Sequence, residues 1–133
     1  MFEPSSERVF AADTANGKIM VLDAKTGQLG SNIEPNYDGT VQRYMNGASL
    51  STLVDGASVG LQKPSGLELH DGLLYVSDYQ SSKIFAFTLN GELVDWLDTG
   101  LPTGSLKGLA IQADGSIFAI DATSQRIVRF SAR

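Results

Sequence analysis

The sequence predicts an all-β protein made of repeated four-stranded sheets, of the kind that form the blades of a β-propeller. One hairpin pattern occurs three times, in residues 9–23, 73–88 and 117–131: an apolar strand ending in Asp, a short polar turn and a second alternating strand. The aspartates of the last two copies are 43 residues apart, and a period of roughly 40–45 residues with four short strands is typical of propeller blades. No stretch shows a sustained helical period.

The first copy is incomplete at its start and carries an insertion. Asp13 precedes Asp78 by 65 residues, 22 more than the interval between the later copies. Residues 1–7 lack a strand pattern, so a regular first strand is doubtful there. The strands expected for this copy are 8–12, 18–22 and 50–56.

The surplus residues correspond to an insertion at about 29–48, in which 37–44 could pair as an extra strand or hairpin. The insertion carries Tyr37 and Tyr44 and several glycines, and an addition of this kind to a repeat scaffold is a candidate surface for binding or subunit contact. A decorative loop is the alternative.

The second copy shows the complete plan. Its expected strands are 66–70, 73–77, 83–88 and 93–97. Asp71-Gly72 is a tight turn of the type that joins hairpin strands. In the third of these strands Ile84 faces one side of the sheet while Phe85 and Phe87 face the other. Both faces of the sheet are therefore apolar and need neighbours.

The third copy repeats this plan over three strands and has no fourth. Its expected strands are 108–111, 117–120 and 126–130. The chain is thus read as a single propeller segment over residues 1–133, with blades at about 7–60, 61–103 and 104–133.

Composition excludes some function classes. The chain has 133 residues, a formal charge of −5 and no cysteine. Because an acidic surface repels phosphate backbones, we expect no nucleic-acid binding. No run of about 18 apolar residues is present, so we expect a soluble protein without a membrane span. The N-terminus does not read as a signal peptide, but the compartment stays open, and a periplasmic or secreted natural protein is compatible with this sequence.

The second copy resembles an NHL repeat. The residues that carry the resemblance are Lys63 to Leu67, Leu74 to Asp78 and Lys83 to Phe87. The third copy shares Gly108, Phe118, Asp121, Arg126, Ile127 and Phe130 with this pattern. It departs from the pattern at Leu106, where the family has Pro, and the first copy matches only from Val9 to Asp23.

The resemblance implies an NHL-like propeller, which usually closes with six blades, so this chain would be half of one. A free stack of three blades would leave two apolar sheet faces bare. We therefore expect a homodimer or other oligomer that completes the ring. The alternative is that this chain is part of a longer propeller. The missing last strand could come from the N-terminal residues of a partner.

The repeated aspartates, Asp13, Asp78 and Asp121, are expected to accept backbone N–H groups of the turn that follows each strand. A catalytic aspartate would be unique to one copy. The resemblance leaves one alternative open, because lactonase-like propellers hold a divalent ion with carboxylates and an Asn from different blades. Asn16, Asp13 and Asp78 would then be candidate calcium ligands, with Asp121 as a further candidate. Otherwise we expect no cofactor.

The loops at the channel face carry the candidate ligand-binding residues: Asn16, Lys63, Ser65, Tyr79, Gln80 and Lys107. Together they offer hydroxyl, amide and ammonium groups for a small polar or anionic ligand, and a plain solvated loop rim is the alternative. His70, the only histidine, is expected at the surface, and we predict no catalytic residue.

The function expected from these observations is a non-enzymatic module that binds a ligand or a protein. The alternative is a hydrolase of the lactonase or strictosidine synthase-like type with its site at the channel face. NHL-type relatives include both, so the fold does not decide between them.

Overall fold

The computed structural model describes residues 1–35 and 38–131, and these form an all-β protein. Four antiparallel sheets account for the strands of the described residues, and the helical residues are two single 3-10 turns. These turns are η1 (Ala24–Thr26) and η2 (Gly56–Ser58). In the described part of the chain no helix is long and apolar enough to cross a membrane.

Sheet 1 is formed by the first copy of the repeat, in the order β1-β2-β3-β6. Its strands are β1 (Phe2–Glu3), β2 (Arg8–Asp13), β3 (Lys18–Asp23) and β6 (Ser49–Asp55). The short strand β1 was not expected, and it pairs with β2 in the register Phe2 to Val9. The amino group of Met1 donates a hydrogen bond to the carbonyl of Phe10 at 2.7 Å. The N-terminal residues thus complete their own sheet, where the sequence had suggested a strand for a partner.

Sheets 2 and 3 are formed by the second and third copies. Sheet 2 has the order β10-β9-β8-β7, and sheet 3 has the order β11-β12-β13. The strands are β7 (Pro64–His70), β8 (Leu73–Asp78), β9 (Lys83–Thr88), β10 (Leu93–Asp98), β11 (Leu106–Ile111), β12 (Ile117–Asp121) and β13 (Arg126–Phe130). Each expected strand is confirmed to within two residues at each end.

The insertion forms a two-stranded antiparallel arm, β4 (Gln28–Pro35) and β5 (Val41–Asn46), which pairs with no other sheet of the described residues. At its base the Ser49 N–H donates a hydrogen bond to Thr26 Oγ1 at 2.7 Å, which closes the chain back onto sheet 1. Tyr37 lies outside the described residues, and the described residues confirm a hairpin within the insertion.

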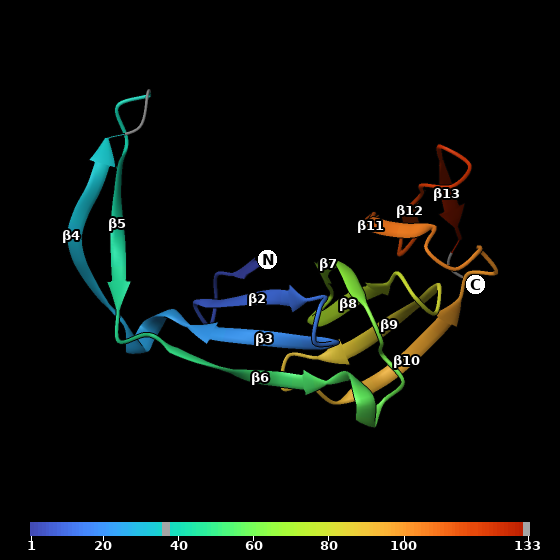
Figure 1. The fold of residues 1–133 in the computed structure, drawn as a ribbon, viewed down its shortest axis with the longest axis horizontal. Coiled ribbons are helices and arrows are strands. Elements are labelled where there is room, and N and C mark those ends of the chain that lie inside the picture. The colour runs from blue at the N-terminus through green and yellow to red at the C-terminus, as the bar shows by residue number, and fades with distance from the viewer. Residues whose placement is uncertain (36–37, 132–133) are drawn as a thin grey trace.

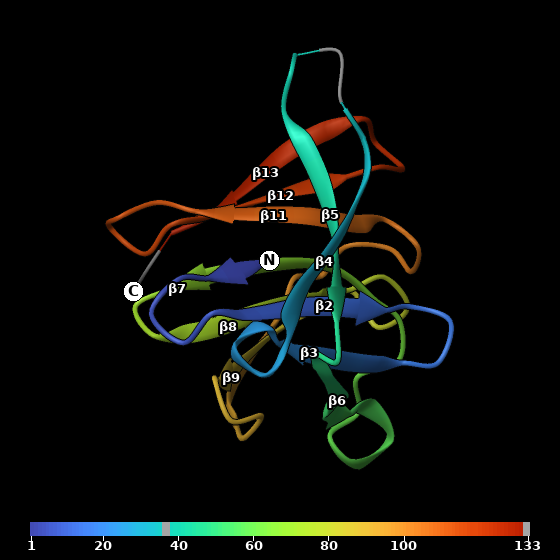
Figure 2. The same ribbon diagram turned by 90° about the vertical axis from the view of Figure 1, so that its left-hand side faces the viewer.

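The three larger sheets stack side by side, with β7 lying next to β2 and β11. Figure 1 shows them fanning out, sheet 1 pointing down, sheet 2 to the lower right and sheet 3 to the upper right. None of these three sheets lies at the upper left, where the arm stands. Figure 2, turned by a quarter, shows sheet 3 again on the opposite side of the N-terminal strand from β3 and β6.

Two apolar cores fill the spaces between these sheets. Sheets 1 and 2 bury Phe10, Ile19, Val54, Leu61, Leu74, Val76, Phe85 and Phe87 between them. Sheets 2 and 3 bury Ile84, Leu106 and Ala119. The predicted alternation in β9 is confirmed, because Phe85 and Phe87 belong to the first core and Ile84 to the second. Sheet 2 is therefore covered on both faces, as the inner layer of a stack requires.

Polar contacts also join sheets 1 and 2 at both ends. Arg8 Nη1 donates a hydrogen bond to the carbonyl of Leu89 at 2.7 Å, and Thr14 Oγ1 donates one to the carbonyl of Pro64 at 2.6 Å. Because these bonds connect distant parts of the chain, they fix the orientation of one sheet on the next.

Gly66 in β7 allows sheet 3 to approach sheet 2 closely. A Cβ atom at Gly66 would lie 2.7 Å from Ser77 Oγ and 2.9 Å from the carbonyl oxygen of Lys107. We predict that Gly66→Ala lowers the free energy of unfolding by about 2 kcal/mol, because the overpacked backbone must move. The measurement is denaturant unfolding at fixed protein concentration.

Gly108 provides the matched control, since it occupies the same place in the repeat on sheet 3. A Cβ atom there would meet only Ile120 Cδ1, at 3.7 Å. Gly108→Ala should therefore leave the stability of a single chain within about 0.5 kcal/mol of the original. Equal losses in the two variants would show that close packing against sheet 3 is not what requires Gly66.

Candidate functional site

The predicted ligand-binding residues lie in the loops and strand ends at one end of the stacked sheets. They come from the β2–β3 turn (Asn16), the segment before β7 (Lys63), β7 (Ser65), the β8–β9 turn (Tyr79, Gln80) and β11 (Lys107). Residues from all three sheets thus contribute to one rim.

Direct contacts bring the central rim residues together. Lys63 Nζ donates a hydrogen bond to the carbonyl of Ala15 at 3.1 Å, and the Tyr79 N–H donates one to the carbonyl of Lys63 at 2.8 Å. Lys107 Nζ lies 3.6 Å from the centroid of the Tyr79 ring, a cation–π arrangement. These contacts link each sheet to the next.

The other predicted rim residues are partly used within the fold. Asn16 Nδ2 donates a hydrogen bond to Asp13 Oδ2 at 2.8 Å. Ser65 Oγ lies 3.1 Å from Ser77 Oγ and 3.1 Å from the carbonyl of Lys107, so it joins sheets 2 and 3. Gln80 is exposed. The contacts of these residues show that the rim joins the sheets. That the rim binds a ligand stays a prediction.

Asp78 is fully buried and is the acceptor for several donors of its own sheet. Its carboxylate accepts hydrogen bonds from the N–H groups of Gln62 at 2.7 Å, Lys63 at 2.9 Å and Gln80 at 2.9 Å, and from Ser81 Oγ at 2.8 Å. Burial raises the pKa of Asp78, but these hydrogen bonds together lower it more, so the pKa lies below its ordinary value.

The equivalent aspartates in the other sheets also bind their own turns. Asp121 is buried and accepts from the Ser105 hydroxyl, from the Ser124 N–H at 3.2 Å and from Arg126 Nε at 3.0 Å. The Ser105 hydroxyl is the main cause that holds the pKa of Asp121 well below its usual range.

Asp13 accepts from the side chain and the N–H of Asn16, and this lowers the pKa of Asp13. The bonding to the following turn that the sequence predicted is therefore present in all three copies. Among residues 1–35 and 38–131, no three His, Asp or Glu side chains gather in a way that could hold a metal ion.

His70 is partly exposed, and so less open to solvent than the predicted surface position suggests. Its side chain is 16% exposed, its ring lies edge-on to Tyr75 with centroids 6.4 Å apart, and Nε2 is 3.4 Å from Asp71 Oδ2. Asp71 in the turn after β7 and the Tyr75 ring on β8 therefore lie against the imidazole, which the strand pattern did not reveal.

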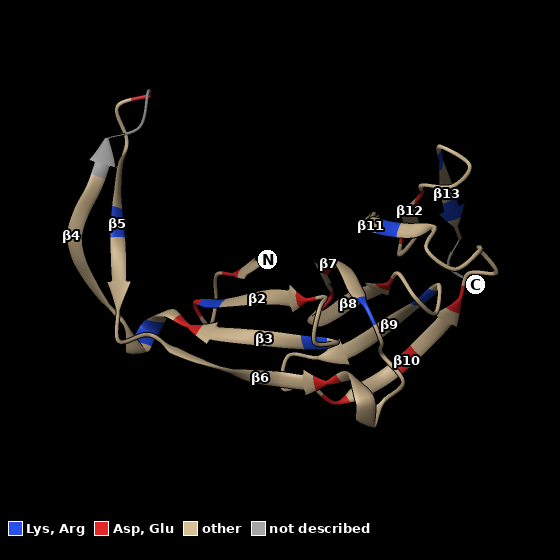
Figure 3. Ribbon diagram, viewed as in Figure 1, with Lys and Arg blue, Asp and Glu red and all other residues tan. Residues whose placement is uncertain are grey.

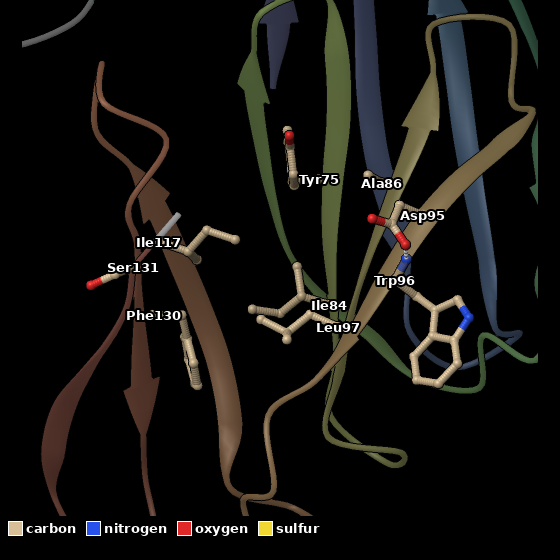
Figure 4. Close-up of a pocket in the computed structure, with 9 residues that line it drawn as sticks. All are labelled: Tyr75, Ile84, Ala86, Asp95, Trp96, Leu97, Ile117, Phe130 and Ser131. Carbon is tan, nitrogen blue, oxygen red and sulfur yellow. Dashed lines mark hydrogen bonds between the residues drawn. The ribbon is translucent and has the colours of Figure 1, made fainter. Parts of the chain in front are cut away.

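A cavity of about 600 Å³ opens between the outer part of sheet 2 and the edge strand β13. Its lining residues are Tyr75, Ile84, Ala86, Asp95, Trp96, Leu97, Ile117, Phe130 and Ser131. Figure 4 shows Ile84 and Leu97 pointing from sheet 2 toward Phe130 and Ile117 of sheet 3. The cavity lies where sheet 2 has a fourth strand, β10, and sheet 3 has none in the described residues.

The outward face of sheet 3 is apolar and packs on no other sheet in the described structure. Register places Ala110 beside Phe118, and Ile120 beside Ile127, on the side away from sheet 2. Ile120 is 48% exposed and Ile127 is 70% exposed. Large apolar side chains in adjacent exposed positions are typical of an interaction surface.

The outward face of sheet 1 is also apolar. One row of paired residues, Phe2, Val9, Leu22 and Leu50, crosses all four of its strands. Phe2 is 52% exposed and Leu50 is 63% exposed. Both ends of the stack therefore present apolar sheet faces.

The sequence matches no protein-family model, and no curated protein is significantly similar to it. The arguments about function therefore rest on the residues and contacts described above.

Proposed function

We propose that this chain is a non-enzymatic interaction module of the propeller type. Its three sheets act as blades of a ring that is closed by further β-sheets, from a second chain or from another part of a longer chain. The rim that includes Lys63, Tyr79 and Lys107 would then surround the mouth of the central channel and offer a surface for a polar ligand or a protein.

The exposure of one repeated isoleucine is the observation that carries this proposal. Ile19, Ile84 and Ile127 hold the same place in the three copies, six residues after the repeated aspartate. Ile19 is 0% exposed against sheet 2 and Ile84 is 2% exposed against sheet 3, whereas Ile127 is 70% exposed. Burial of such a side chain contributes roughly 1.5–3 kcal/mol, so a sheet that covers Ile127 would be strongly favoured.

The hydrolase alternative receives less support from the site. A lactonase-like centre would need carboxylates from several blades to converge near the channel. Asp78 and Asp121 instead accept hydrogen bonds from N–H groups of the turns that follow them, Gln80 and Ser124. Their arrangement favours a binding module whose aspartates hold the loops in place.

Light scattering combined with size-exclusion chromatography tests the proposal. Over a wide concentration range the chain should elute with a mass greater than that of one copy, and Ile127→Asp should lower that mass. A chain that stays a single copy, does not bind a dye specific for exposed apolar surface and is unaffected by Ile127→Asp would contradict the proposal.

The arm should be dispensable for the fold of a single chain. Because β4 and β5 pair only with each other, replacing residues 29–45 by a short glycine-containing turn should change the free energy of unfolding by no more than about 0.5 kcal/mol. Thermal unfolding of the full chain and of the shortened chain is the comparison. A large loss would mean that the arm supports sheet 1.

A further inference from the structure

We propose that the partner is a second copy of this chain, bound head to tail, so that sheet 3 of each copy packs on sheet 1 of the other. This inference rests on the proposed function and specifies its partner and contact. The ring would be closed by two identical contacts related by a two-fold axis.

The two free faces correspond to the two halves of a contact that the chain already makes. Sheet 1 turns Phe10 and Ile19 toward sheet 2, and the equivalent residues of sheet 3, Phe118 and Ile127, face outward. A copy that receives sheet 3 on its sheet 1 would repeat the internal contact between sheets 1 and 2.

The free face of sheet 1, which would receive sheet 3, corresponds in the repeat to the face of sheet 2 that packs on sheet 1. Sheet 2 turns Leu74, Val76 and Phe87 toward sheet 1, and all three belong to the first core. The repeat places Val9 and Leu22 of sheet 1 at the positions of Leu74 and Phe87, and both lie on the free face. The second contact would therefore match apolar residue to apolar residue in the established register.

Charge favours this pairing of unlike faces over a pairing of like faces. The residues of sheet 1 and its turns, 1–27 and 49–55, carry five acidic and three basic side chains. Residues 106–131 carry two acidic and three basic side chains. Figure 3 shows the basic residues on β11 and β13 and acidic residues at the strand ends of sheet 1. Sheet 3 therefore attracts sheet 1, whereas two copies of sheet 1 repel each other.

The rotation from each sheet to the next favours a ring that is closed by two copies of the chain. Sheets 1, 2 and 3 turn progressively about a centre near the N-terminus and β7, and none of them lies between sheet 3 and the arm in the upper part of Figure 1. A second copy rotated about a two-fold axis would place its three sheets there. The second copy would also meet the arm of the first, whose Leu29 and Tyr44 are 65% and 55% exposed. Head-to-tail contacts close into a ring when the rotation fits and form filaments when it does not.

Complementation between two variants tests the head-to-tail contact. Ile127→Asp blocks the face of sheet 3, and Leu50→Asp blocks the face of sheet 1. Both residues are exposed in the single chain, so the variants should fold. Each variant alone should lose the dimer, with the apparent dissociation constant raised by about a hundredfold. An equimolar mixture should recover part of the dimer, because one intact contact remains between unlike copies.

Val94→Asp is the matched control, since Val94 is 53% exposed on the outer strand of sheet 2. It should leave the dimer intact. A dimer lost in only one of the two face variants, or a mixture without recovery, would overturn the head-to-tail contact while the proposed function stands. A dye-binding single copy that finds its partner only in a different chain would do the same. Growth into filaments would overturn the ring of two copies, because head-to-tail contacts that do not close grow without limit. A single copy that exposes no apolar surface and ignores all substitutions would overturn both.

Discussion

Phe87→Ala should lower the free energy of unfolding by about 3–5 kcal/mol, the largest effect of an apolar truncation that we expect in this chain. Phe87 is 0% exposed and lies in the core between sheets 1 and 2, where its ring stacks on Phe85 with centroids 6.1 Å apart. Truncation removes buried apolar area and leaves a cavity that two rigid sheets cannot close. Denaturant unfolding at a fixed protein concentration gives the value, since assembly makes stability depend on concentration.

Trp96→Ala serves as the comparison on the same sheet. Trp96 is 52% exposed on β10, and its main specific contact is Lys83 Nζ, 4.2 Å from the ring centroid. Its loss should cost about 1 kcal/mol. If Phe87→Ala cost no more than Trp96→Ala, sheets 1 and 2 would not be packed on each other through this core.

The order of strands could be predicted from the sequence because one repeat carried three independent signals. The period of the repeat, the turn residues and the two-residue alternation all agreed in the second copy. The faces of β9 followed directly, with Ile84 on one side and Phe85 and Phe87 on the other. The same alternation gave apolar outer faces for the first and last sheets, and Leu50 and Ile127 are indeed exposed there.

Strand β1 and the turn after it could not be predicted, because they leave no periodic pattern in the sequence. Strand β1 is only two residues long, and backbone contacts such as the bond from the Phe10 N–H to the carbonyl of Met1, 2.7 Å, hold it in place. The Ser5 and Ser6 hydroxyls donate hydrogen bonds to Glu3 in the turn after it, which lower the pKa of Glu3 to about 2. Backbone and turn contacts of this kind have no periodic signature.

The candidate site was predictable in its residue types and only partly in its connections. The repeated aspartates were expected to bind the turn that follows each strand, and they do so. That Asp78 would also bind the Gln62 and Lys63 N–H groups could not be foreseen, because these residues lie 16 and 15 positions earlier in the sequence. The contact between Lys107 and Tyr79 likewise joins two sheets. The spacing of residues along the chain does not indicate how close two sheets lie.

Asp78→Asn should lower the free energy of unfolding by about 3 kcal/mol, the largest effect that we expect from a polar substitution. The carboxylate of Asp78 is fully buried and accepts from N–H and hydroxyl donors on both of its oxygens. An Asn amide would point an NH₂ group at some of these donors, so buried donors would lose their acceptor. Asp13→Asn is the matched control, because within the described part of the chain Asp13 accepts only from Asn16, in an exposed turn. Its loss should cost less than about 1 kcal/mol.

Low pH should also destabilise the fold through Asp78. The pKa of Asp78 lies below its ordinary value of 3.8 in the folded chain, so the unfolded chain takes up a proton first as the pH falls. The stability that this carboxylate contributes is fully present above about pH 4 and is lost as the pH falls further toward the folded pKa. Asp78→Asn should therefore flatten the fall in stability below pH 4, leaving the part that comes from other carboxylates with lowered pKa values, Asp121 and Glu3 among them, while Asp13→Asn should leave most of it. A variant that lost stability at neutral pH but kept the full acid dependence would show that Asp78 supports the loop by its shape and not by its charge.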